Sequence, residues 1–161
     1  MEIRQGTLKD LPVILEIYAR ARKFMAEHGN PDQWGTKWPP EEIVREDLET
    51  GVGYVAVEDG KILGVCHYRF GENAEENYRV IDGAWIREGA YGVVHRLAAM
   101  SSKTGAGEAL VRWAVERSGG HLRIDTHRNN VPMQNLLKKL GFTYCGVIRV
   151  GDGTERHAFE I

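Results

Sequence analysis

Residues 101–107, with the sequence S-S-K-T-G-A-G, are of types that could bind an anion. We call this segment the glycine loop. Gly105 and Gly107 have no Cβ, so a ligand can approach the N–H groups of a helix that begins there. The positive end of that helix adds roughly half a unit charge, and Lys103 adds a full one beside it. The combination favours a pyrophosphate. The alternative is that the glycines only let a helix pack closely on a strand.

Two other phosphate-binding motifs fit this segment less well. A P-loop needs four residues between its glycines, followed by Gly-Lys-Ser/Thr, whereas one residue separates Gly105 from Gly107 and Lys103 precedes both. The dinucleotide fingerprint G-x-G-x-x-G could begin at Gly105, with Asp125 as its later acid, but Leu110 occupies the third glycine position. NAD(P) binding is therefore kept only as a weak alternative.

Composition indicates one soluble globular domain over residues 1–161, with 42% hydrophobic and 27% charged residues. The net charge of −2 argues against nucleic acid as the main partner. There is no apolar stretch of membrane-spanning length, and the first residues lack a signal-peptide pattern, so we expect a cytoplasmic protein that does not engage a membrane. Cys66 and Cys145 each sit in an apolar run, which predicts buried, reduced thiols. The six histidines show no metal-ligand spacing, so no metal is expected.

Hydrophobic periodicity predicts an alternation of strands and helices along the whole chain. Helices are expected over residues 11–25, 41–50, 107–118 and 130–140, with a capping box at Thr7 and Asp10 and an N-cap at Asn130. Strands are expected over residues 1–6, 91–100, 121–127, 142–150 and 155–161, and in a hairpin over 53–70 that turns at Asp59-Gly60. Residues 71–90 read as a long loop with a short strand around 81–85. This order predicts a mixed sheet in one α/β domain.

Residues 102–107 match the motif Q/R-x-x-G-x-G/A, except that Ser102 replaces Gln or Arg. Residues 130–142, N-V-P-M-Q-N-L-L-K-K-L-G-F, match a second motif, an Asn that leads into L-Y-x-K-L-G-F. With these two motifs the chain resembles the GNAT superfamily of acetyl-CoA-dependent N-acetyltransferases. The resemblance covers essentially the whole chain. It implies an α/β (α+β) fold whose mixed, mostly antiparallel central sheet has splayed fourth and fifth strands and helices on both faces.

The resemblance also implies acetyl-CoA as cosubstrate and names the residues that would hold it. Main-chain groups of the strand before the glycine loop would pair with pantetheine, the loop would hold the pyrophosphate, and an Asn would bond the pantetheine arm. In this sequence the positions are Leu97, Ala98 and Ala99 for the strand, Ser102, Lys103, Thr104, Gly105, Ala106 and Gly107 for the loop, and Asn130 for the arm.

The resemblance implies only part of a set of catalytic residues. Asp125 falls where some members carry a glutamate base, so we expect it to be the base, with a surface carboxylate as the alternative. Leu137 stands where the family usually has the tyrosine that protonates the thiolate. Water or Tyr144 would then supply that proton, or catalysis is slow, or the chain binds acyl-CoA without transferring it. His95 could be a base or a substrate contact, or simply a packing residue.

The expected reaction is transfer of an acetyl group from acetyl-CoA to a primary amine by direct attack, through a tetrahedral intermediate. The acceptor is a small-molecule or peptide amine of unspecified identity. Trp34 and Trp38 lie in the region that borders the family's acceptor pocket, although they could equally cover the edge of the core. The closing strands would permit a homodimer. The alternative function is a non-catalytic acyl-CoA-binding module.

Overall fold

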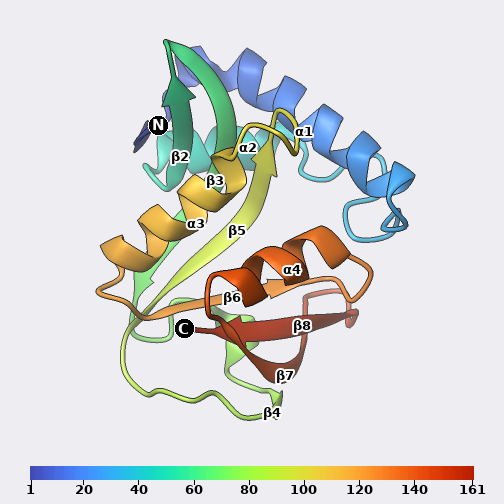
Figure 1. Ribbon diagram of the computed structural model, residues 1–161, viewed down its shortest axis with the longest axis vertical. Coiled ribbons are helices and arrows are strands. Elements are labelled where there is room, and N and C mark those ends of the chain that lie inside the picture. The colour runs from blue at the N-terminus through green and yellow to red at the C-terminus, as the bar shows by residue number, and fades with distance from the viewer. The chain divides into compact units, whose positions relative to one another are not determined.

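A computed structural model describes residues 1–161 (Figure 1). The strands are β1 (Glu2–Gln5), β2 (Gly53–Glu58), β3 (Lys61–Gly71), β4 (Asp82–Gly83), β5 (Tyr91–Ala99), β6 (Leu122–Thr126), β7 (Thr143–Arg149) and β8 (Glu155–Glu160). The helices are α1 (Leu11–Glu27), α2 (Glu41–Glu49), α3 (Ala106–Arg117) and α4 (Val131–Lys139), with 3-10 turns η1 (Leu8–Asp10) and η2 (Glu76–Tyr78). The strand order is β1-β2-β3-β5-β6-β8-β7-β4. β5 and β6 are parallel, whereas the pairs β1–β2, β2–β3, β4–β7, β6–β8 and β7–β8 are antiparallel. The predicted mixed, mostly antiparallel sheet is confirmed.

Two compact units make up the chain. Unit 1 contains Met1–Tyr68 and His95–Trp113, and unit 2 contains Arg69–Val94 and Ala114–Ile161. The splayed pair predicted for the fourth and fifth strands corresponds to β5 and β6, because the short strand β4 precedes them. Within unit 2 these strands pair at Gly92 with Leu122 and at Val93 with Arg123, near the start of each strand. The prediction of one domain over residues 1–161 stays a prediction.

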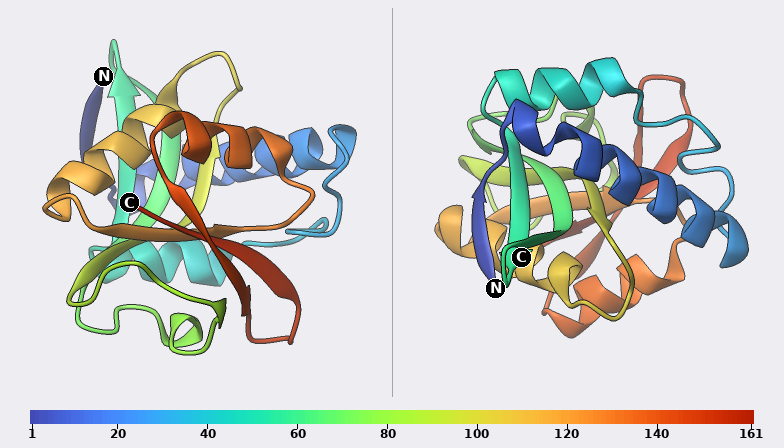
Figure 2. Two further views of the ribbon diagram at one scale, coloured as in Figure 1. Left: turned by 60° about the horizontal axis from the view of Figure 1, so that its bottom comes forward. Right: turned by 90° about the horizontal axis from the view of Figure 1, so that it is seen from above.

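Unit 1 places helices on both faces of its strands, as Figures 1 and 2 show. On one face the apolar sides of α1 and α2 form a core with alternate residues of β2 and β3. The buried members are Leu11, Ile14, Ile17, Tyr18, Val44, Leu48, Val55, Val65 and Ala98. On the other face α3 approaches β3 at Gly64, where an added Cβ would lie 2.8 Å from the Cβ of Ala106. Gly64 and Val65 point to opposite faces because side chains alternate along a strand.

The local signals read from the sequence of unit 1 are also present. The N–H of Thr7 donates to the Asp10 carboxylate at 2.8 Å, which confirms the capping box, although the first turn is the 3-10 helix η1. Arg4 binds both oxygens of Asp10, at 2.8 and 3.1 Å, and this hydrogen bonding lowers the pKa of that carboxyl. The β2–β3 hairpin turns at Asp59 and Gly60, both with positive φ, as the Asp-Gly pair predicts.

Unit 2 packs the predicted long loop against its strands through aromatic side chains. The short strand β4 forms where it was expected, pairing Asp82 with Val147 and Gly83 with Gly146. The 3-10 turn η2 was not predicted, and it buries Tyr78 in the core of this unit. The buried members of this core are Tyr78, Tyr91, Val93, Ile148 and Ala158, with Ala74, Ile81, Trp85 and Val150 at its margin. The two cysteines, Cys66 in unit 1 and Cys145 in unit 2, are free and buried, as predicted.

A buried carboxylate fixes the segment after β4 in unit 2. Glu160 accepts hydrogen bonds from the main-chain N–H groups of Ile86 and Arg87, at 2.6 and 3.1 Å. Its other oxygen lies 2.7 Å from Arg123 Nε and 2.8 Å from His121 Nε2. Burial raises the pKa of Glu160, but these hydrogen bonds outweigh it and hold the pKa below its ordinary 4.5. The Glu160 carboxylate is therefore charged at neutral pH, and both of its oxygens have hydrogen-bond partners.

Glu160→Gln tests this assignment. The variant leaves the buried guanidinium of Arg123 without its counter-charge, so we expect the free energy of unfolding in urea to fall by about 3 kcal/mol. Glu155→Gln on the same strand is the matched control, because its ion pair with Arg149 is solvent-exposed and its loss is expected to change stability by less than about 1 kcal/mol. Equal losses for the two variants would contradict the assignment.

Candidate functional site

The glycine loop, in unit 1, connects β5 to the first turn of α3. Ser101, Ser102 and Lys103 are exposed, and the helix begins at Ala106. The Thr104 hydroxyl donates to the main-chain oxygen of Ser101 at 3.1 Å, and its oxygen accepts from the N–H of Ala106 at 3.1 Å. This side chain therefore sets the turn that starts the helix. The remaining N–H groups of the first turn have no carbonyl one turn back, as at any helix start.

The surroundings of the glycines distinguish the two explanations for them. An added Cβ at Gly105 or at Gly107 would meet nothing within 4 Å. Gly105 has a φ of 76°, which alone favours glycine, but Gly107 has no such requirement. Gly64, on β3, is instead the glycine that allows α3 to pack closely on the sheet, because an added Cβ there would also lie 3.1 Å from Leu110 Cδ1. Internal packing does not account for Gly107, and its bare backbone faces open space.

Main-chain groups at the end of β5 point alternately toward β3 and away from it. The N–H of Met100 donates to the oxygen of Leu63 in β3 at 2.8 Å, and Ala98 is buried. Main-chain groups of successive strand residues point to opposite edges. Those of Leu97 and Ala99 therefore point away from β3, which is the orientation that pairing with an extended ligand requires.

A clasp within unit 1 holds β5 just before these residues. Arg96 has a φ of 51°, an unusual value for a residue other than glycine. Its guanidinium binds both oxygens of Asp47 in α2, at 2.9 and 2.8 Å, and the Tyr18 hydroxyl donates to its main-chain oxygen at 2.8 Å. Burial raises the pKa of Tyr18 above its ordinary 10, so this hydroxyl stays a donor. α1 and α2 together therefore fix the bend that precedes Leu97.

In unit 2, Asp125 is half-buried and receives a hydrogen bond from the hydroxyl of Tyr78, at 2.6 Å from Oδ2. No sequence signal pointed to this pair, because the two residues are 47 positions apart. Asn130 caps α4, accepting from the N–H of Met133 at 3.2 Å, which confirms the predicted N-cap. Its role in binding a ligand stays a prediction.

The structure does not bring Tyr144 to the same face of the sheet as Asp125. The register pairs Tyr144 and Ile124 with Phe159, whereas Asp125 pairs with Ala158. Since paired residues share a face and neighbours alternate, Tyr144 and Asp125 project from opposite faces of β6–β8–β7. Tyr144 is half-exposed, and Leu137, at the position of the family's usual tyrosine, is fully buried.

The remaining predicted residues of the site lie in unit 1. The ring of His95 is 5.5 Å from that of His67, centroid to centroid. Trp34 packs edge-on against Tyr18 at 5.7 Å, at the margin of the core, as the alternative interpretation of this residue expected. Trp38 remains 43% exposed, and its main-chain N–H donates to the main-chain oxygen of Trp34 at 3.2 Å. A direct role of either tryptophan in acceptor binding stays a prediction.

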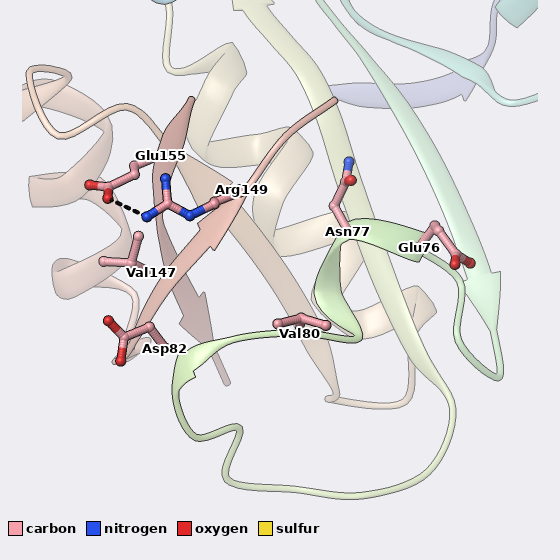
Figure 3. A pocket seen from close by; sticks show the side chains of 7 residues that line it. All are labelled: Glu76, Asn77, Val80, Asp82, Val147, Arg149 and Glu155. Atoms are coloured by element: carbon pink, nitrogen blue, oxygen red, sulfur yellow. Dashed lines mark hydrogen bonds and ion pairs between the residues drawn. The ribbon is translucent and has the colours of Figure 1, made fainter. Parts of the chain in front are cut away.

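An open pocket of about 410 Å³ lies in unit 2, and sequence reasoning did not find it (Figure 3). Its lining residues are Glu76, Asn77, Val80, Asp82, Val147, Arg149 and Glu155. Arg149 forms an ion pair with Glu155 at 3.0 Å across one wall. None of the predicted site residues lines this pocket. Its lining residues lie on η2, in the segment between η2 and β4, and on β4, β7 and β8, and they form no sequence motif.

No group of three or more His, Cys, Asp or Glu side chains in the structure could hold a metal ion. None of the helices combines the length and the apolar character that crossing a membrane requires.

Two glycine-to-alanine variants test the different roles of Gly107 and Gly64. In Gly107→Ala the new methyl group points into open space and restricts the unfolded chain, so the free energy of unfolding is expected to rise by up to about 1 kcal/mol. In Gly64→Ala the methyl group overlaps Ala106, and a loss of about 2 kcal/mol is expected. Denaturant unfolding measures both, and a destabilised Gly107→Ala would show that this glycine serves packing.

Comparisons with known proteins agree with this fold. The family model described as the acetyltransferase (GNAT) family matches residues 14–142. The structure of a GNAT-family acetyltransferase from Streptococcus agalactiae 2603 is 30% identical and superposes with a TM-score of 0.83, covering 99% of this chain and 93% of that one. A Staphylococcus aureus Mu50 protein assigned as an acetyltransferase is 28% identical, with a TM-score of 0.70 and coverage of 100% and 98%.

A more distant likeness concerns the fold alone. The structure of yncA from Salmonella typhimurium, solved with its cofactor acetyl-CoA, is 16% identical, with a TM-score of 0.64 and coverage of 99% and 92%. A search of curated proteins gives no match. The family match over most of the sequence, together with the 30% identity across nearly all of it, shows that the chain belongs to the GNAT family of acetyltransferases.

Proposed function

We propose that this protein transfers an acetyl group from acetyl-CoA to a primary amine. Membership of the GNAT family supports an acyltransferase. The acetyl-CoA in the structure of yncA, which shares this fold, supports the choice of donor. The observation in this chain that carries the proposal is the bare backbone at Gly107, which neither conformation nor internal packing explains.

The glycine loop supplies the chemistry that a pyrophosphate needs. The first turn of α3 directs N–H groups outward, and the helix dipole adds to their positive potential. Lys103 is exposed beside them and contributes a full positive charge, while the exposed hydroxyl of Ser102 adds a donor. A Cβ at Gly105 or Gly107 would stand between the phosphate oxygens and these N–H groups, so glycine at both positions suits a close approach.

The pantetheine arm would pair with main-chain groups of Leu97 and Ala99, which point away from β3. This is the recognition mode in which an extended ligand adds to a strand edge. The clasp of Arg96 with Asp47 and Tyr18 would keep that edge in place. The Asn130 side chain would contribute a further polar contact to the arm.

The reaction requires a base for the amine and a source of a proton for the leaving thiolate. In the proposed mechanism the Asp125 carboxylate takes a proton from the substrate ammonium, and the free amine attacks the thioester carbonyl carbon. The C–N bond forms, the nitrogen loses its second proton to solvent, and the C–S bond breaks as the tetrahedral intermediate collapses. The departing sulfur takes a proton from solvent, so one proton is released for each acetamide formed.

The second candidate function, a non-catalytic acyl-CoA-binding module, is favoured by one observation. Leu137, which stands where the family's usual acid would be, is fully buried and has no proton to give. Such a module would bind coenzyme A through the glycine loop in the same way. The two functions differ only in whether free thiol is released when an amine is present.

Coenzyme A binding is the first test. Isothermal titration is expected to show binding of coenzyme A and none of NAD, and Gly107→Val is expected to weaken the binding of coenzyme A at least tenfold, about 1.4 kcal/mol, because its side chain covers the helix start. Gly151→Val is the matched control, since an added Cβ there also meets open space, but in the β7–β8 turn. Unchanged affinity in Gly107→Val, or binding of NAD instead, would contradict the site.

Turnover is the second test. Thiol release from acetyl-CoA is measured over spermidine, lysine, kanamycin and a peptide with a free N-terminus. Asp125→Asn cannot accept the proton, so kcat is expected to fall about 100-fold, with coenzyme A affinity within twofold of the original. Glu49→Gln, which changes an exposed acid at the end of α2, is the control. Coenzyme A binding without thiol release for any amine would favour the binding module.

A further inference from the structure

The hydroxyl of Tyr78 makes a short bond to the one carboxylate that the proposed mechanism uses as its base. The oxygen of Tyr78 lies 2.6 Å from Asp125 Oδ2, within the range of strong bonds from a hydroxyl to a charged oxygen. Tyr78 belongs to η2, in the segment between β3 and β4, whereas Asp125 lies on β6. Folding of this otherwise irregular segment therefore delivers a donor to the carboxylate.

Tyr78 is itself held firmly in unit 2. Its side chain is 2% exposed, and its ring packs 5.1 Å from that of Trp85 and stacks at 6.2 Å on that of Tyr91. The indole N–H of Trp85 donates to the main-chain oxygen of Tyr78 at 2.9 Å. With both its ring and its main chain fixed, the hydroxyl cannot swing away from Asp125.

The protonation of Tyr78 suits a permanent donor. Burial and the negative charge of Asp125 raise the pKa of Tyr78 well above its ordinary 10. The phenol of Tyr78 therefore keeps its proton at neutral pH. Its bond to Oδ2 stops rotation of the carboxylate about the Cβ–Cγ bond, so Oδ1 keeps one direction.

We propose that Tyr78 is a positioning residue that orients the Asp125 carboxylate for proton transfer. This role rests on the proposed function, because it matters only if Asp125 is the base. A carboxylate that must first find its orientation spends part of its time in unproductive rotamers, which lowers kcat without weakening substrate binding.

Tyr78→Phe is the test, because it keeps the ring and removes only the hydroxyl. The expected result is a fall in kcat of about tenfold, with KM for acetyl-CoA and for the best amine of the panel within twofold of the original. Tyr91→Phe is the matched control. It removes a hydroxyl from the same aromatic cluster, but one that contacts the main chain of Glu75 at 3.3 and 3.4 Å rather than Asp125.

The double variant separates action through Asp125 from a general loss of structure. In the Asp125→Asn background, adding Tyr78→Phe is expected to change the residual rate by less than twofold, because the base is already gone. A further tenfold fall there, an unchanged kcat in Tyr78→Phe, or an equal fall in Tyr91→Phe would overturn the proposal. Full activity in Asp125→Asn alone would instead remove Asp125 as the base, which is a failure of the proposed mechanism.

A crystal structure of Tyr78→Phe gives a readout that does not depend on turnover. We expect the Asp125 side chain to leave its present rotamer or to occupy more than one, while Trp85 and Tyr91 keep the substituted ring in its place. An Asp125 carboxylate with unchanged position and full order in that structure would overturn the positioning role.

Discussion

The close contact between β3 and the start of α3 is the constraint on which the proposed donor site depends. Gly64 offers no side chain at this point, so Ala106 can sit directly on the strand, and Leu110 and the main-chain oxygen of Ala98 complete the contact. Protein interiors are packed too densely for such a helix to shift locally. The contact with β3 therefore fixes where α3 begins, and it fixes the end of the glycine loop that leads into the helix. The buried Gly64 thus helps to fix the position of Gly105 and Gly107 at the start of α3.

Each unit uses a polar clasp where its main chain departs from regular structure. In unit 1, Asp47 and Tyr18 hold the bend at Arg96, and each of the three is otherwise part of an ordinary helix or strand. In unit 2, Glu160 holds the N–H groups of Ile86 and Arg87, which no strand or helix would satisfy. Main-chain polar groups without partners cost free energy when they are shielded from water, so these clasps stabilise irregular segments of the backbone.

Sequence reasoning succeeded where the signal is local. The Asp59-Gly60 turn, the N-cap at Asn130 and the periodic apolar faces of the helices each depend on residues a few positions apart, and all are present. The bond between Tyr78 and Asp125 joins segments 47 residues apart, and no periodicity announces it. The sequence also could not predict the face of the sheet from which Tyr144 projects, because a register irregularity between Tyr144 and Gly146 changes the alternation of side chains along β7. The family resemblance pointed to Asp125 but not to its partner.

The place of β8 between β6 and β7 has a consequence for how a nascent chain acquires this structure. Residues 86 and 87 emerge from the ribosome more than seventy positions before the carboxylate of Glu160 that fixes them. Until β8 inserts, β6 and β7 have no strand to pair with on that side, and the aromatic cluster around Tyr78 lacks Ala158. Such long-range closure slows folding and leaves apolar surface accessible meanwhile. The core of unit 2 therefore cannot be completed before β8 has left the ribosome.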